Sequence, residues 1–275
     1  MRVATITLAS AARATHVERQ QDRLRLREPD AARVVVWLDD ELPAAGAIDA
    51  ELVHVPPADA GLRLAAGRNA GADAAIALGA DALVFLDADC IAGDDLVRRY
   101  VAGMRAMPGA LLAGPVTYLA EGVVVDDTTD LAALTAPHAA RPAPEADALV
   151  VADEADRVLF WSLSFALTAA TWQRIGGFDD GYVGYGGEDT DYAMRSQQAA
   201  VPLVWVGGAD AYHQHHPTSS PPLQHVDDIL RNGRRYAQRW GSWPMLGWLE
   251  AFEAAGVVER RGADWRRVPG ARPPA

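Results

Sequence analysis

The 275-residue sequence predicts an α/β fold with a mostly parallel central sheet flanked by helices. The first observation is that short apolar runs alternate with helical patterns over residues 1–118, as in chains of β-α units. The second is that runs such as 34–38 (VVVWL) are apolar along their whole length, which is typical of strands buried on both faces. Half of the residues are hydrophobic, so the chain can bury a substantial core.

The elements of the first 118 residues follow from hydrophobic periodicity. Strands are predicted at 3–8, 34–38, 52–55, 82–86 and 111–118, the last interrupted at Gly114 and Pro115. Helices are predicted at 15–27, at 61–78 and from Asp94 and Asp95 to residue 105, where acids favour the helix N-terminus. Ligands of such sheets bind at the carboxyl ends of the strands.

The pattern changes after residue 118. Residues 119–157 are rich in Ala, Pro, Asp and Thr without sustained periodicity, and we interpret them as a long surface loop. A strand is then predicted at 158–167, a helix at 170–175 ending at Gly176, a helix at 189–199, a strand at 203–206 and a helical region at 226–253. We therefore predict a main domain over 1–217, with halves 1–118 and 158–217, and a helical C-terminal extension over 218–275.

Charge and composition exclude several classes of protein. The net charge is −12 and all 25 basic residues are Arg, which argues against nonspecific nucleic-acid binding. The single cysteine, Cys90, excludes an internal disulfide and is consistent with a reducing compartment. Residues 3–8 fit a buried strand better than a signal peptide, and no stretch approaches the roughly 20 apolar residues of a membrane span. These features predict a cytoplasmic enzyme.

Two acids follow the predicted strand 82–86. Asp87 and Asp89 stand at i and i+2, so on a strand end the following turn can bring both carboxylates to one point. Two carboxylate ligands suit Mg²⁺ or Mn²⁺ better than Zn²⁺. A pair of solvated acids at a strand end is the structural alternative.

A second acidic group lies about a hundred residues downstream, where Glu188, Asp189 and Asp191 follow Gly186 and Gly187. The glycines allow close approach of a substrate to the backbone, and a helix N-terminus stabilises carboxylates. One of these acids could take a proton from a hydroxyl group. The alternative is a helix N-cap with first-turn acids.

Three separated motifs resemble those of one enzyme family. Residues 176–191 read GGFDDGYVGYGGEDTD, residues 87–89 read DAD, and residues 66–71 read AGRNAG, in which Gly67 departs from the usual Ala. The chain thus resembles the family 2-type glycosyltransferases of the GT-A fold over residues 3–217. The likeness is greatest to the branch that shares a GGFDxxYxGYGxEDxD segment with galactosyl- and N-acetylgalactosaminyltransferases.

The resemblance implies a function for each half of the domain. Residues 1–118 would bind the nucleotide and residues 158–217 would bind the acceptor and carry catalysis. The enzyme would move a sugar from a nucleotide diphosphate donor, expected to be a UDP-sugar, to an acceptor hydroxyl. Asp189 is predicted to be the general base of an inverting single displacement, and Glu188 is the second predicted catalytic residue. The family also includes retaining members.

The resemblance also implies a metal site. It gives metal contact to the last acid of the DxD motif, Asp89, with Asp87 beside it, and both would face the donor diphosphate. The family supplies a histidine to the same metal from the region of the cluster 213–216 (HQHH), where we expect His213 first and His215 second. A zinc site is a poor alternative, because the only cysteine, Cys90, lies far away in the sequence.

The remaining predicted site residues bind substrates. Arg68 is expected to reach the phosphates or base of the nucleotide, and Asp39 its uracil or ribose, while a surface ion pair is the alternative for Arg68. The predicted acceptor-binding residues are Trp161, Gly187, Glu188 and Asp191. The acceptor class stays open between a glycan, a lipid-linked acceptor and a small molecule.

Two other functions and a contact with a membrane surface remain as alternatives. A sugar-nucleotide nucleotidyltransferase shares the acidic metal site but normally has a glycine-rich phosphate loop, and residues 9–14 contain no glycine. A carbohydrate-binding protein without activity would have little use for both acidic motifs. The tryptophans of the C-terminal region either pack its helices onto the sheet or contact a membrane surface.

Overall fold

The computed structural model describes residues 1–271 and contains a central sheet of eight strands. In spatial order the strands are β3 (Glu51–His54), β2 (Ala32–Trp37), β1 (Val3–Ala9), β4 (Ala82–Asp87), β9 (Ser164–Thr168), β6 (Leu111–Ala113), β10 (Leu203–Val206) and β8 (Leu149–Val151). The four pairs β3–β2, β2–β1, β1–β4 and β6–β10 are parallel and the other three pairs are antiparallel. The predicted mostly parallel α/β sheet is confirmed.

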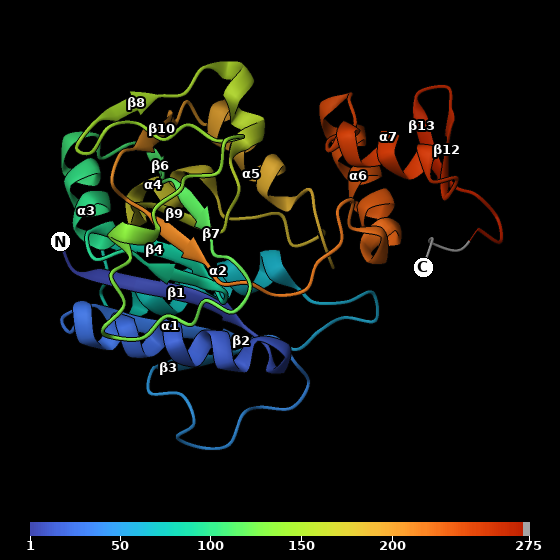
Figure 1. Cartoon of the computed structure of the whole chain (residues 1–275). Coiled ribbons are helices and arrows are strands. Elements are labelled where there is room, and N and C mark those ends of the chain that lie inside the picture. Colours follow the sequence, from blue (N-terminus) through green and yellow to red (C-terminus); the bar gives the residue numbers. More distant parts are fainter. Residues whose placement is uncertain (272–275) are drawn as a thin grey trace.

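Helices cover both faces of this sheet (Figure 1). One face packs on α2 (Leu64–Ala77), α4 (Ala169–Ile175) and α5 (Glu188–Gln198), and the other on α1 (Ala14–Arg27) and α3 (Leu96–Ala106). Aromatic residues fill the first interface: Phe85 of β4 and Phe165 of β9 are register partners whose rings stack 4.3 Å apart. Because β1 pairs in parallel with both β2 and β4, these three strands have their carboxyl ends together at one edge of the sheet.

A second sheet of three short strands lies beyond that edge. It contains β5 (Cys90–Ala92), β11 (Ala211–His213) and β7 (Val116–Tyr118). The predicted interruption at Gly114 and Pro115 divides the run 111–118 between the two sheets. A side chain at residue 114 would collide with the carbonyl oxygen of Ala209, so glycine is required where the chain crosses over.

The predicted loop 119–157 and the predicted strand 158–167 both differ in detail from the structure. The segment 119–157 is largely loop, but it also contains β8 and the 3₁₀ helix η2 (Ala132–Leu134), and most of η3 (Glu154–Leu159) lies within it. The strand predicted at 158–167 begins only at Ser164. Arg157 explains why the strand begins late. Its buried guanidinium donates to the Ala193 and Val201 carbonyls and to the Ser196 hydroxyl, and these bonds hold the residues around Arg157 in the 3₁₀ helix η3.

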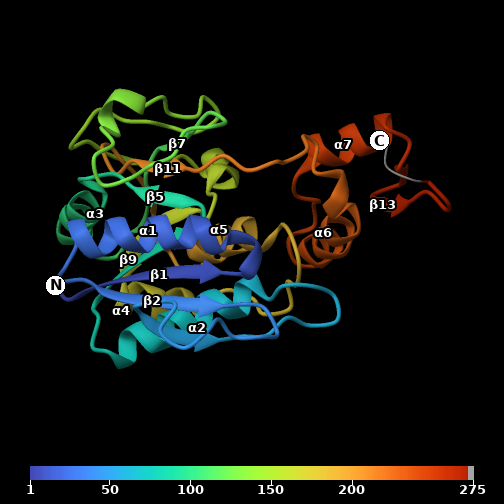
Figure 2. The ribbon, with the colours of Figure 1, turned by 60° about the horizontal axis from the view of Figure 1, so that its bottom comes forward.

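The C-terminal residues form a lobe beside the main sheet (Figure 2). The lobe contains η4 (Leu223–His225), α6 (Val226–Trp240), α7 (Leu246–Ala254) and a hairpin of β12 (Val258–Arg261) and β13 (Asp264–Arg267) that the sequence did not predict. Its apolar side chains form a cluster of their own, which supports our proposal that the chain divides near residue 217. Within residues 1–271 no helix combines the length and apolar character needed to cross a membrane.

Candidate active site

The turn after β4 and the end of β11 meet at the carboxyl edge of the main sheet. Asp87 ends β4, and Asp89 lies in the turn that leads into β5. Antiparallel pairing of β11 with β5 places His213 opposite Cys90, and the Gln214 N–H donates to the Asp89 carbonyl at 2.7 Å. The pairing of these two strands therefore brings residues more than 120 positions apart to one point.

Asp89, His213 and His216 form a cluster with the geometry of a metal site. Their ligand atoms all lie within 4.8 Å of one another, with His213 Nε2 3.5 Å and His216 Nε2 3.3 Å from the Asp89 carboxylate. Burial raises the pKa of Asp89, but the His216 hydrogen bond and the charges of His213, His216 and Arg13 outweigh it and lower the pKa to about 2. An ionised carboxylate with two imidazoles fits a divalent cation such as Mn²⁺.

The histidine assignment changes in one respect. His213 lies in the cluster as predicted, but His215 is exposed and His216 takes the place expected for it. Alternation along an extended strand would put residues 213 and 215 on one side, but β11 ends at His213 and residues 214–219 have no regular structure. His216 reaches Asp89 from this irregular segment.

This geometry predicts an order of metal affinities among three alanine variants. His213→Ala and His216→Ala should each weaken Mn²⁺ binding by at least about tenfold, because each removes one imidazole from the cluster. His215→Ala, the matched control on the same segment, should bind Mn²⁺ like the parent. Isothermal titration with Mn²⁺ alone measures all three, and equal affinities for His215→Ala and His216→Ala would contradict the assignment.

Asp87 faces Arg68 instead of the cluster. Arg68 is buried on α2 and donates to Asp87 Oδ1 and to Glu188 Oε1, each at 3.2 Å. Burial raises the pKa of Asp87 to about 6 despite the nearby Arg68 charge, with Asp89 and Glu188 adding to the rise. Arg68 thus forms ion pairs with both acidic motifs, and its predicted contact with the nucleotide stays a prediction.

Glu188 and Asp189 begin α5, as predicted to within one residue. Gly187 precedes them with φ 91°, a conformation that favours glycine, and Asp189 Oδ1 accepts from the Thr190 N–H at 2.7 Å. Burial and the neighbouring Glu188 raise the pKa of Asp189 to about 7. Glu188 Oε2 is buried without a hydrogen-bond partner within residues 1–271. A carboxylate with a pKa near neutrality is suited to accept a proton.

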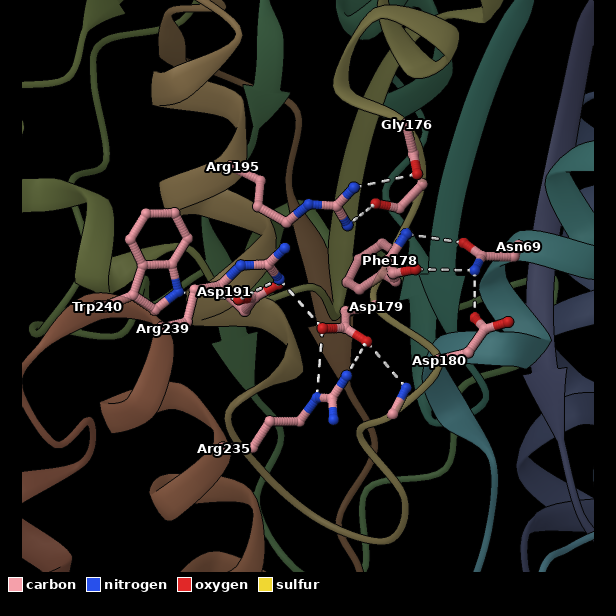
Figure 3. Close-up of polar contacts among 12 residues, drawn as sticks. Asn69, Gly176, Phe178, Asp179, Asp180, Asp191, Arg195, Arg235, Arg239 and Trp240 are labelled. Atoms are coloured by element: carbon pink, nitrogen blue, oxygen red, sulfur yellow. Dashed lines mark hydrogen bonds and ion pairs between the residues drawn. The ribbon is translucent and has the colours of Figure 1, made fainter.

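Asp191 does not line an open site, contrary to the prediction of acceptor binding. Its side chain is fully buried, and its Oδ1 accepts from Trp240 Nε1 at 2.9 Å and from Arg239 at 3.3 Å (Figure 3). Asp189 and Asp191 are two positions apart on α5, and residues at that spacing do not share a helix face, so Asp191 points away from the side that carries Asp189. It joins α5 to the C-terminal lobe.

The other predicted substrate residues lie around the same edge. Asp39 follows β2, and its Oδ2 accepts from the Ala11 N–H at 2.5 Å in the loop after β1. Trp161 is half-buried, and its ring packs against His138 and lies 5.2 Å from the Arg141 guanidinium carbon. These contacts involve only part of each side chain, so Asp39 and Trp161 remain candidates for the roles predicted from the sequence.

Sequence reasoning missed three residues of this site. Arg13 donates to Asp89 Oδ2 at 3.3 Å from η1 (Ala11–Arg13), directly after β1, so a basic residue following a strand was the available signal. Tyr118 stacks on His213 with ring centroids 4.5 Å apart, and Tyr185 lies close enough to Asp189 and Glu188 for their charges to raise its pKa after the larger effect of burial. Only Tyr185 lay within a recognised motif.

Comparisons with solved structures agree with this architecture. A complex described as GalNAc-T7 with UDP, GalNAc and Mn²⁺ superposes with a TM-score of 0.57 at 13% identity, covering 87% of this chain and 48% of that one. A fragment of S. aureus TarS superposes with a TM-score of 0.56 at 12% identity, covering 86% of this chain and 65% of that one. The fold is of the GT-A type.

Sequence comparisons match limited parts of the chain, and the family model covers the second acidic motif. A family model described as the N-terminal domain of galactosyltransferase matches residues 159–217. Two relatives named validoxylamine A glucosyltransferase, from Streptomyces hygroscopicus subspecies jinggangensis and limoneus, are 33% identical over 79 residues, which is 26% of this GT-A chain. The match spans less than a fifth of either relative, 18% and 17%.

Proposed function

We propose that this chain is a metal-dependent glycosyltransferase that moves a sugar from a UDP-sugar to an acceptor hydroxyl. One observation carries the proposal: Arg68 joins the DxD motif to the base motif through two contacts of 3.2 Å. The motif that contains Asp89 of the candidate metal cluster and the motif that contains the candidate base Asp189 therefore both contact one guanidinium. A donor diphosphate and an acceptor hydroxyl would meet between them.

The residues would divide the work as follows. Asp89, His213 and His216 would hold a divalent cation, which when bound supplies Lewis-acid stabilisation of the departing diphosphate. Arg13, beside Asp89, would add positive charge in a protein whose net charge of −12 disfavours anionic ligands. Asp39 would contact the nucleoside.

The acceptor side would be formed by α5 and the segments that face it. Asp189 would take the acceptor proton as the hydroxyl attacks the anomeric carbon, which gives inversion by single displacement. Glu188 and the Gly187 backbone would orient the acceptor, and Trp161 would offer an apolar ring face to a sugar. The acceptor would be a glycan, a lipid-linked sugar or a small molecule, and the family 2 motif assignments are part of this proposal.

The similar proteins support the same proposal by their names. The family model refers to a galactosyltransferase, and the two curated relatives are named as glucosyltransferases. Among the similar structures, one complex contains UDP and Mn²⁺ and another TarS complex contains UDP-GlcNAc. A UDP-sugar donor and a manganese ion are therefore the first ligands to test, with Mg²⁺ as the alternative cation.

A thermal-shift panel tests the donor class. UDP-, GDP- and dTDP-sugars are each added with and without Mn²⁺, and a ligand at 100 times its Kd should stabilise the folded state by about 2.7 kcal/mol. We expect UDP-sugars with Mn²⁺ to raise the melting temperature most. Release of UDP on addition of an acceptor pool then separates a transferase from a binding protein. Shifts that are independent of Mn²⁺, or absent for every nucleotide sugar, would contradict the proposal.

A further inference from the structure

We propose that helix α6 of the C-terminal lobe is a clamp that holds the glycine-rich loop 179–187 and so positions Asp189, with Trp240 as the main positioning residue. The proposal rests on the proposed role of Asp189 as base. It assigns to the C-terminal lobe a task in catalysis, beyond packing against the main domain.

The first argument is that the loop cannot hold its own conformation. Gly184, Gly186 and Gly187 all have positive φ, between 72° and 91°. Glycine reaches such conformations easily, but it also loses more conformational freedom on folding than any other residue. A loop with this composition needs contacts from outside to keep Glu188 and Asp189 at the start of α5 in one place.

Helix α6 supplies those contacts along one face. Asp228, Asn232, Arg235 and Arg239 are spaced four, three and four residues apart, so they lie on one side of the helix. Asp228 accepts from the Tyr185 N–H at 3.1 Å, and Asn232, which is 1% exposed, donates to the Val183 and Tyr185 carbonyls at 3.0 and 3.2 Å. The middle of the loop is thus held by its backbone.

The two ends of the loop are held by charge. Arg235 donates to Asp179 at 2.7 Å and Arg239 donates to Asp179 at 3.1 Å, at the start of the loop. At the other end Arg239 and Trp240 both donate to Asp191, two residues after Asp189 on α5 (Figure 3). Arg239 therefore ties both ends of the loop to one helix.

At the buried end of this network, one hydrogen-bond donor is expected to have the largest effect on the position of α5. Asp191 is fully buried, and hydrogen bonds to a charged group contribute about 1.5–3 kcal/mol each. The shortest contact of its carboxylate with α6 is the 2.9 Å bond from Trp240 Nε1. Loss of that one donor should release the start of α5 without removing the aromatic ring that packs there.

Trp240→Phe tests the clamp, because it deletes the indole N–H and keeps an aromatic ring. Hydrogen–deuterium exchange of the full chain should become about 10- to 100-fold faster for the amides of residues 179–191. Turnover should fall by a similar factor, while UDP–Mn²⁺ affinity should stay within about twofold, since the candidate metal ligands lie elsewhere. Trp243→Phe is the matched control, because Trp243 packs on Arg234 and Gly233 of the same lobe.

Arg239→Gln is the second variant in case Trp240→Phe folds poorly, and it should change exchange over the same residues. The proposal is overturned if neither variant accelerates exchange there more than Trp243→Phe does. A purely structural role would instead accelerate exchange across the whole C-terminal lobe and weaken UDP binding together with turnover, which also overturns it. Faster exchange in a protein that releases no UDP from any sugar donor would uphold the clamp and reject the proposed function.

Discussion

Asp189→Asn should lower sugar transfer by about 10²- to 10⁴-fold, the usual contribution of a positioned base. Asparagine has the same shape and keeps an oxygen that can accept from the Thr190 N–H, but it cannot take the acceptor proton. UDP–Mn²⁺ affinity should change little, because the candidate metal cluster is formed by Asp89 and two histidines. Steady-state turnover and calorimetric UDP affinity, measured on one preparation, check both parts.

The same substitution separates catalysis from helix capping. Asn caps helices about as well as Asp, so a capping role predicts nearly unchanged stability and turnover. Asp227→Asn is a suitable control, because Asp227 is an exposed acid in the first turn of α6. Parent-like turnover of Asp189→Asn would reject the proposed base and leave Glu188 as the next candidate.

The pH dependence of turnover gives an independent check on this base. The raised pKa of Asp189, about 7, means that the carboxyl is largely protonated below that pH and cannot accept a proton there. Turnover should therefore rise as the pH increases through about 7 and level off above it. In Asp189→Asn the residual rate should lose this rise. A parent profile that is flat between about pH 5 and pH 9 would contradict the assignment.

Asp89→Ala should abolish Mn²⁺-dependent binding of UDP while the protein stays folded. The substitution removes the one carboxylate of the cluster. The two side chains that remain, His213 and His216, offer imidazole nitrogens but no negative charge to the cation. The side chain lies in a turn after β4 and outside the apolar core clusters, so the secondary structure should survive. We expect a loss of at least about 100-fold in Mn²⁺ affinity, beyond the range found for residues that only support metal ligands.

Calorimetric titration of Mn²⁺, followed by UDP, measures this loss, and circular dichroism verifies the fold. Asp40→Ala is the matched control, because Asp40 is an exposed acid just after another strand of the same sheet. The metal site would be misplaced if Asp89→Ala bound UDP and Mn²⁺ as tightly as the parent. A loss in both variants would point to the general negative field of the protein instead of a specific ligand.

Local patterns in the sequence predicted the positions of Asp87, Asp89, Glu188 and Asp189 along their elements. A buried apolar run locates a strand end, and glycines followed by acids locate a helix start, because both depend on neighbours in the chain. The directions of the side chains depend on contacts between distant segments. That is why the sequence did not predict the ion pair between Asp87 and Arg68, two residues that it assigns to the donor site.

Tertiary contacts also explain the choice of histidine and the place of Asp191. The strand β11 ends at His213 and the irregular segment after it brings His216, not His215, to Asp89, and no periodicity within HQHH predicts where a strand ends. Asp191 belongs to the same motif as Asp189, but a helix from the C-terminal lobe covers it. A motif records which residues occur together, and it does not record which of them the rest of the chain buries.

The pairing of β11 with β5 has a consequence for how this chain can vary. In a strand the side-chain direction reverses at every residue, so a slip of one position would turn His213 to the far side of the small sheet, where Tyr212 is now buried. The short connection 207–210 between β10 and β11 sets that register. A single insertion or deletion there would separate Asp89, His213 and His216, the residues of the candidate metal cluster, without replacing any of them.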